Sequence, residues 1–302
     1  MAHRPIVAAA AAVVLLAAGF LGLHVAQVRH NRLDLTPQKA APEGEPFRPG
    51  EIFALTLAAV VEHELEAPFG WRPNDFLLWG PRLLADNNAN RQLGIIRAVR
   101  ETARVFKDHL TKVSSDEYDP DLLEADTLLR NDATKLWFPS AEGRFRQAVR
   151  KLRAYATGLR ADSPRNRPIA VRNVELIRLF QAWTDLLGDA HANLYRSAAP
   201  GGGSVWFSTD DYFYRAQGYA HVMHHMMGAL RREYDSLLKE RPSLETLFEE
   251  TTSALGEAAV IKPLFVLNGG PGGILANHRR NLDGYVTESR QKMYSIREEL
   301  EK

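Results

Sequence analysis

The sequence of 302 residues contains no cysteine, and its charges almost cancel. A chain without cysteine has no disulfide, no thiolate metal site and no thiol nucleophile. Its formal net charge is +1, so no global field draws the protein towards nucleic acid or an acidic partner. At 45% hydrophobic residues, the chain is long enough to build one large core or two small ones.

Signatures of several catalytic and binding classes are also missing. The sequence has no H-E-x-x-H metalloprotease motif and no G-x-S-x-G nucleophile elbow. It has no zinc-finger, RRM or basic-zipper pattern. Asp210 and Asp211 point apart on a helix, and we expect them in a first turn, where the helix dipole favours acids. The sequence therefore predicts no cofactor and no nucleic-acid partner.

The N-terminus holds the one long apolar run. Residues 6–28 read IVAAAAAVVLLAAGFLGLHVAQV and carry no charge. As a helix this run spans about 34 Å, enough to cross a hydrocarbon core of about 30 Å. A cleaved signal peptide is the alternative, but its apolar region is shorter and ends in an A-x-A-like site. Here the small residues 17–19 fall inside the run. The pattern favours an uncleaved transmembrane anchor over residues 1–30, with the bilayer as its partner.

The charges around the run do not decide its orientation. Arg4 and the terminal amine precede it, and Arg29 and Arg32 follow it, so the positive-inside count is balanced. Residues 31–50 contain four prolines and predict a stiff linker between the anchor and the folded part.

Helical patterns dominate residues 51–302. We expect helices over residues 51–66, 88–112, 120–136, 141–159, 168–195, 208–239, 242–262 and 273–302. Asp119 and Ser140 are the expected N-caps of two of them. No series of alternating strand segments is visible. The prediction is an all-α protein: a transmembrane helix followed by a bundle of about seven to nine helices, with a candidate subdomain boundary at residues 197–206.

Four stretches together resemble a known family. They are GWRPNDFLLWGPRLLADNNANRQLG, LWFPSAEGRFRQAVRKLRAYATGL, DDYFYRAQGYAHVMHHMMGALRREYD and VLNGGPGGILANHRRNLDGYVTESR. In this order they resemble the uncharacterised bacterial family catalogued as domain of unknown function 2333, over most of the chain after the linker. The resemblance implies a single-pass protein of the bacterial inner membrane with its main domain in the periplasm. It carries no established activity, so no catalytic residue is transferred.

Three histidines raise the question of a metal site. His221, His224 and His225 lie at i, i+3 and i+4, on one face of a helix, where imidazoles can bind zinc or copper. An apolar stripe occupies the other face: Tyr219, Met223, Met226, Leu230, Tyr234 and Leu237. We therefore expect the methionines to face the core and the histidines to face water beside Arg231 and Arg232. A solvated polar face is favoured over a metal site.

A basic run extends from Arg144 to Arg172. The candidate anion-binding residues in it are Arg144, Arg146, Arg150, Lys151, Arg153 and Arg160. This face would meet phospholipid head groups, an anionic glycan or an acidic protein. The alternative is a solvated face paired with acids elsewhere in the chain, such as Glu245 and Glu249.

Aromatic and amide side chains gather in WRPNDFLLWGPRLLADNNAN. Trp71, Phe76 and Trp79 are expected to pack at the top of the bundle, with a membrane interface as the alternative. Asn87, Asn88 and Asn90 are expected to cap helices and satisfy loop backbone.

A glycine-rich loop precedes the last predicted helix. Its structural residues are Asn268, Gly269, Gly270, Pro271, Gly272, Gly273, Asn277 and His278. Ile274 and Leu275 stand where a P-loop needs lysine and Ser or Thr, so the loop is not a phosphate cradle of that type. Glycines here permit positive φ and close approach of the backbone. We expect the loop to dock the last helix.

These observations favour a non-enzymatic single-pass envelope protein whose helical domain binds a protein partner, an anionic lipid or a glycan. An envelope enzyme acting on an anionic lipid or glycan is the alternative. A histidine-based metal-binding protein is a third hypothesis.

Overall fold

The computed structural model describes residues 3–33, 35, 46–67, 70–75, 87–111, 117–170, 172–195, 205–261 and 278–302. Within these ranges the protein contains helices and turns and no strand. The α-helices are α1 (His3–His30), α2 (Glu51–Leu65), α3 (Asn87–Val105), α4 (Pro120–Leu129), α5 (Ala141–Arg160), α6 (Asn173–Tyr195), α7 (Val205–Glu233), α8 (Asp235–Glu240), α9 (Pro242–Val260) and α10 (His278–Glu301). A π-helical turn, Phe106–Leu110, extends α3. The all-α prediction is confirmed for the described residues.

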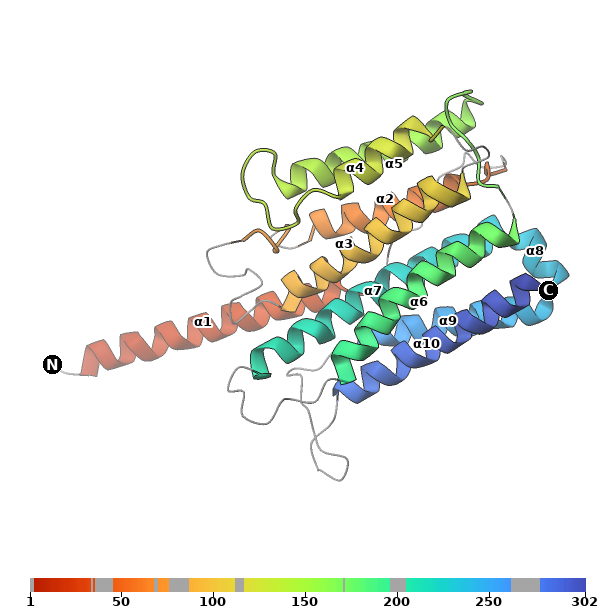
Figure 1. The fold of residues 1–302 in the computed structure, drawn as a ribbon. Helices are drawn as coiled ribbons and strands as arrows, with labels where there is room; N and C mark the ends of the chain where they lie inside the picture. The colour runs from red at the N-terminus through yellow and green to blue at the C-terminus, as the bar shows by residue number, and fades with distance from the viewer. Residues whose placement is uncertain are drawn as a thin grey trace.

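The helices of the body form a stack of pairs (Figure 1). α4 and α5 make the outer layer, and they cover α2 and α3. The pair α6 and α7 follows, and α9 and α10 close the opposite side. One continuous apolar core runs through this stack from α2 to α10.

α7 lies at the centre of the stack. It contacts α2, α3, α6 and α9, and α10 and α8 as well. Met223, Met226 and Leu230 are fully buried, so the predicted apolar stripe does face the core. Val222 and Met227, on other sides of the helix, are fully buried too. Such a helix is apolar on several sides because it has neighbours on several sides.

Two glycines bring α3 and α7 into close contact. A Cβ atom at Gly218 of α7 would lie 2.7 Å from the backbone nitrogen of Ile95 and would clash with the carbonyl oxygen of Arg91. A Cβ at Gly94 of α3 would lie 2.8 Å from Cα of Arg215. Because these neighbours are backbone atoms, no side-chain rotation can relieve the clash. The glycines therefore fix how near the two helices approach.

Several helix ends follow local sequence signals. The side chain of Asp119 accepts hydrogen bonds from the backbone N–H groups of Asp121 (3.0 Å) and Leu122 (3.1 Å), and Pro120 is the first residue of α4. Ser140 Oγ accepts from the N–H of Gly143 at 3.1 Å. Both predicted N-caps are confirmed.

Other helix ends differ from the prediction because distant groups bind the backbone. α4 ends at Leu129 and not near Leu136, since Arg100 of α3 donates to the carbonyls of Leu129 (2.7 Å) and Asn131 (2.6 Å). α6 begins at Asn173 and not at Pro168. The N–H of Ile169 donates to Pro49 O at 3.1 Å and that of Ala170 to Leu110 O at 2.8 Å, which holds this segment out of the helix.

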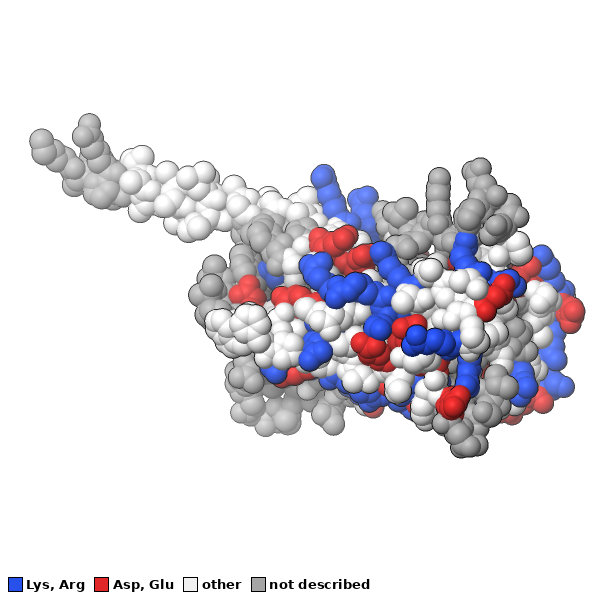
Figure 2. Space-filling model, turned by 90° about the horizontal axis from the view of Figure 1, so that it is seen from above, with Lys and Arg blue, Asp and Glu red and all other residues white. Residues whose placement is uncertain are grey.

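α1 projects from one end of the body as a lone helix (Figures 1 and 2). Exposed apolar side chains cover it: Val7, Val13, Val14, Leu15, Leu16, Leu21 and Val25. Among the residues with described placement, no helix combines the length and apolar character needed to cross a membrane. The helix over residues 6–28 is confirmed, and its transmembrane role stays a prediction.

The segment that joins α1 to α2 contacts the domain at both ends. Leu33, Leu35 and Phe47 pack against the core, and the Arg232 guanidinium lies over the Phe47 ring, 4.9 Å from its centroid. Most of the predicted proline-rich linker lies outside the described residues. So do Phe76, Trp79, the glycine-rich loop from Asn268 to Asn277 and most of the 197–206 connection. His278 is the first residue of α10.

The α3–α7 contact yields a stability prediction. Gly218→Ala should lower the free energy of unfolding by about 1–3 kcal/mol, because the added methyl has only backbone to displace. Gly228→Ala is the matched control in the same helix, since a Cβ there has nothing within 4 Å. The control should be neutral or stabilise by up to about 1 kcal/mol. Chemical denaturation of both variants measures the difference, and equal values would contradict the close-packing account.

Candidate functional site

The first turns of α3 are polar but buried. Asn88, Asn90, Arg91 and Gln92 are all shielded from solvent. The Asn90 amide donates to Asp211 Oδ1 at 2.6 Å, and its oxygen accepts from Arg215 Nε at 3.1 Å. These bonds join α3 to α7, so Asn90 ties two helices together. Asp211 lies in the second turn of α7 and not in the first, because α7 already begins at Val205.

Gln92 connects α3 to the chain that follows α2. Its amide nitrogen donates to the carbonyl of Glu64 at 3.2 Å, and its oxygen accepts the N–H of Arg72 at 2.8 Å. Trp71 is buried, as predicted, and its indole N–H donates to Ala133 O at 2.7 Å. These contacts fix the C-terminal end of α2 beside the start of α3.

A buried ion pair lies at this junction. Arg91 Nη1 of α3 donates to Glu64 Oε1 of α2 at 2.8 Å, and each side chain is only 1% exposed. Burial opposes ionisation of Glu64, but the charge and hydrogen bond of Arg91 outweigh it, so the pKa of Glu64 is lowered. Glu64 is therefore a carboxylate at neutral pH. Its second oxygen, Oε2, has no hydrogen-bond partner among the described protein atoms.

Two histidines adjoin this carboxylate. His30, the last residue of α1, stacks on His63 of α2 with ring centroids 3.9 Å apart and an angle of 5° between the planes. His63 Nε2 donates to the backbone carbonyl of His30 at 2.8 Å. One nitrogen of each ring and one oxygen of Glu64 lie within 4.8 Å of one another. The C-terminus of α1 is thus held beside α2 by a cluster of potential metal ligands.

The histidines of α7 are less exposed than predicted, and two of them, His221 and His225, interact with His63 of this cluster. His221 is fully buried, and neither of its ring nitrogens has a partner among the described atoms. Its ring contacts that of His225 with centroids 4.6 Å apart, and His224 Nδ1 donates to Thr252 O at 2.9 Å. The prediction of a solvated histidine face is wrong for His221, whereas His224 and His225 keep partial exposure; α2, α3 and α9 all pack against α7.

Burial keeps these imidazoles neutral. It lowers the pKa of His225 to about 3, with further contributions from His224, His63 and Arg91. Burial and the Arg91 charge lower the pKa of His221 well below its usual value. Burial also lowers the pKa of His224 and of His30, although Glu64 opposes the shift at His30. At neutral pH each of these rings carries a lone pair on one nitrogen.

The predicted anion-binding residues on α5 divide into two groups. Lys151 binds Glu124 (2.7 Å) and Asp121 (3.5 Å) of α4, while Arg153 pairs with Glu62 and Arg160 with Glu51 of α2. Arg144, Arg146 and Arg150 form no ion pair within the described part of the chain, and the last two are exposed. The acids that pair with Lys151, Arg153 and Arg160 come from α2 and α4. Glu245 and Glu249, which the sequence suggested, bind Arg231 instead.

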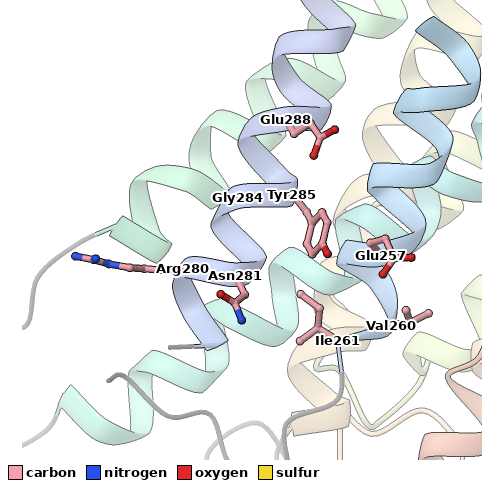
Figure 3. Close-up of a pocket in the computed structure, with 8 residues that line it drawn as sticks. All are labelled: Glu257, Val260, Ile261, Arg280, Asn281, Gly284, Tyr285 and Glu288. Atoms are coloured by element: carbon pink, nitrogen blue, oxygen red, sulfur yellow. The ribbon is translucent and has the colours of Figure 1, made fainter. Parts of the chain in front are cut away.

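An open groove lies between the end of α9 and the start of α10 (Figure 3). It measures about 720 Å³, and its lining includes Glu257, Ile261, Asn281, Tyr285 and Glu288. Arg280 extends away from Tyr285 and Glu257 (Figure 3). The 16 residues 262–277 that connect the two helices lie outside the described residues.

Comparison with protein families gives a clear match. The model described as "Uncharacterized protein conserved in bacteria (DUF2333)" matches residues 6–201 and 196–302. The chain belongs to the DUF2333 family. No curated protein and no solved structure matches it. The family description names no activity, so the chemistry of this DUF2333 chain must be inferred from its side chains.

The sequence singled out the histidines of α7 but gave no indication of the cluster formed by His30, His63 and Glu64. The spacing of His221, His224 and His225 identified one helix face. His30, Glu64 and Arg91 carry no such signal, because they come from three other points of the chain and meet only in the folded bundle. Glu64 lies in a mainly apolar helical pattern, which was the available hint of burial, whereas Arg91 lies among polar residues.

The buried pair yields a second stability prediction. Arg91→Met should cost about 3–5 kcal/mol of unfolding free energy, because it leaves the Glu64 carboxylate buried without its partner. Arg97→Met, on the same helix, is the matched control. Arg97 pairs with Asp189 at 2.6 Å, but the two side chains are 52% and 57% exposed. Its loss should cost no more than about 1 kcal/mol. Equal costs in urea denaturation would show that Glu64 and Arg91 are not buried as a pair.

Proposed function

We propose that this protein is a non-enzymatic, single-pass envelope protein whose helical domain rests on an anionic bilayer surface. The main support for this proposal is a pair of exposed aromatic residues in the α4–α5 connection. Trp137 is 71% exposed and Phe138 is 95% exposed. Large apolar side chains exposed side by side mark a contact surface.

The position of this pair supports the bilayer as its occupant. The α4–α5 connection lies at the end of the body from which α1 projects (Figure 1). Ala133 of that connection accepts the indole N–H of Trp71, which follows α2. The last turn of α2 contacts His30 at the end of α1. An apolar helix and two exposed aromatics at the same end of the body fit a membrane surface, where tryptophan is favoured at the interface.

Cationic side chains follow directly after the aromatic pair. Arg144 and Arg146 belong to the first two turns of α5, and Arg150 lies one turn further on. Their lack of carboxylate partners in the described structure leaves them available for lipid phosphates, at about 1 kcal/mol for each arginine near an anionic surface. The face formed by α4 and α5 carries both charge signs, as Figure 2 shows, so the proposed attraction rests on these three arginines and not on the face as a whole.

Residues 6–28 would supply the anchor in this proposal. Their support is an uncharged run of 23 residues, its helical conformation and the exposed apolar side chains of α1. The proposal puts the domain on the periplasmic side of the inner membrane. The lack of cysteine is compatible with that oxidising compartment.

The cysteine-free chain allows a direct test with single labels. Phe138→Cys and Val174→Cys are each labelled with a polarity-sensitive fluorophore in the full-length protein, reconstituted in vesicles with or without anionic lipid. Val174 is the control, because it is 63% exposed and α6 begins at the opposite end of the body. The label at position 138 should shift to the blue and be quenched by lipid-attached quenchers, more strongly with anionic lipid. The label at 174 should behave as in water.

Emission typical of water from both positions would contradict the bilayer contact. A second outcome is that the label at position 138 shifts to the blue in detergent and resists quenching by lipid-attached quenchers. That result would point to a protein contact in place of the bilayer. Arg146→Glu in the Phe138→Cys background should weaken the anionic-lipid effect, and Arg165→Glu should not, since Arg165 follows the distant end of α5.

The topology is tested with the same control cysteine. Val174→Cys in intact spheroplasts should react with a membrane-impermeant maleimide, since the proposal exposes the domain to the periplasm. Gel-shift analysis of the labelled protein measures the reaction. Reaction only after lysis would place the domain in the cytoplasm and contradict this part of the proposal.

A further inference from the structure

The cluster at the end of α1 offers unused electron-pair donors in a buried place. His30 Nε2 and Glu64 Oε2 are buried and have no hydrogen-bond partner among the described protein atoms. His63 donates its Nε2 proton to the His30 carbonyl, so a neutral His63 ring keeps its lone pair on the other nitrogen. We propose that His30, His63 and Glu64 bind a divalent transition-metal ion of the zinc class.

The spacing and the chemistry of the donors agree with this ion. The three ligand atoms lie within 4.8 Å of one another, and because the two imidazole rings are stacked in nearly parallel planes, they must tilt for both lone pairs to point at one ion. Two imidazoles and one carboxylate are a set that zinc accepts, with a fourth position left open. Calcium and magnesium prefer a shell made of oxygen alone, which this cluster does not provide.

Hydrogen bonds with neighbouring groups orient two of the proposed ligands, Glu64 and His63. Arg91 occupies Glu64 Oε1 at 2.8 Å and leaves Oε2 for the metal, so it orients the carboxylate. The backbone carbonyl of His30 plays the corresponding part for His63, because it fixes which ring nitrogen is protonated. The positive charge of Arg91 repels a bound cation and offsets the negative charge of Glu64. The two imidazole donors therefore have to supply most of the affinity for the metal.

α7 brings two further histidines to this region, although neither joins the group of donors that lie within 4.8 Å of one another. His221 is fully buried with both ring nitrogens unpartnered in the described structure, and His225 Nε2 is likewise unpartnered. Both histidines interact electrostatically with His63 and with Arg91. The sequence assigned these histidines to solvent, and the fold brings them near His63 of α2.

A bound ion would join α1 to the body. His30 belongs to α1, whereas His63 and Glu64 belong to α2. In the described structure the end of α1 is otherwise held by contacts such as the 3.4 Å hydrogen bond from Asn31 to Asn88. The metal would thus fix the direction in which α1 leaves the domain. The metal site does not depend on the proposed bilayer contact. It is tested in detergent, where no bilayer is present.

The test uses the untagged full-length chain in detergent with Zn²⁺ as the only added metal. Wild type should retain one Zn²⁺ per chain after dialysis and melt at a higher temperature with Zn²⁺ than without it. His30→Phe keeps a ring stacked on His63 and removes the donor nitrogens. It should melt as wild type does without metal and bind Zn²⁺ at least about 10-fold more weakly. X-ray absorption at the zinc edge should show at least two imidazole ligands in wild type.

His191→Phe is the matched control. His191 of α6 pairs with Asp283 at 2.7 Å, outside the cluster, and its side chain is 39% exposed. This variant should bind Zn²⁺ as wild type does. His63→Phe is the second variant at the site, should His30→Phe unfold. The proposal is overturned if wild type retains no stoichiometric Zn²⁺, if His191→Phe loses it equally, or if the folded site variant binds as tightly as wild type.

Discussion

The buried ion pair between Glu64 of α2 and Arg91 of α3 is the contact on which the centre of this structure depends. Removing two such charges from solvent costs several kcal/mol for each ion, and only close geometry and further hydrogen bonds offset that cost. The Glu64–Arg91 pair has the close geometry, at 2.8 Å, but Glu64 Oε2 and Arg91 Nε and Nη2 have no hydrogen-bond partner among the described atoms. Gln92, the next residue along α3, donates to the Glu64 carbonyl and fixes the two helices in register.

The central helix depends on the same point. α7 crosses α3 over the backbone of Arg91, where Gly218 lets the helices approach. That approach buries His221 beside the ion pair, and burial together with the Arg91 charge keeps its ring neutral. The α7 histidines His221 and His225 therefore lie near the buried ion pair and His63 inside the bundle. Buried polar groups such as Glu64, Arg91 and His221 cost stability when they lack hydrogen-bond partners. Such groups are typical of functional sites.

The sequence predicted what depends on neighbouring residues. The N-caps Asp119 and Ser140 lie where expected, because a cap acts on the two or three residues that follow it. The apolar stripe of α7 was also predictable, since 3.6-residue periodicity is local. The premature end of α4 was not, because it depends on Arg100 from another helix.

The site was less predictable than the fold for the same reason. Whether His221 faces water depends on how many helices surround α7, and nothing within α7 itself reveals that number. The pairing of Glu64 with Arg91 and the stacking of His30 on His63 join separate helices, and residue spacing gives no measure of such contacts. Only the division of the α5 cations was partly foreseeable, and even there the acids that bind Lys151 and Arg153 were not those the sequence suggested.

The most direct test of the central ion pair is a double-mutant cycle. Glu64→Leu, Arg91→Met and the double variant are compared with wild type by the free energy of unfolding. Each single change leaves one buried charge without its partner, whereas the double change removes both. The account predicts that the double variant is more stable than either single one, with a coupling at or above the upper end of the usual range of about 0.5–3 kcal/mol. Additive costs would show that the two side chains do not depend on each other, and would contradict the account.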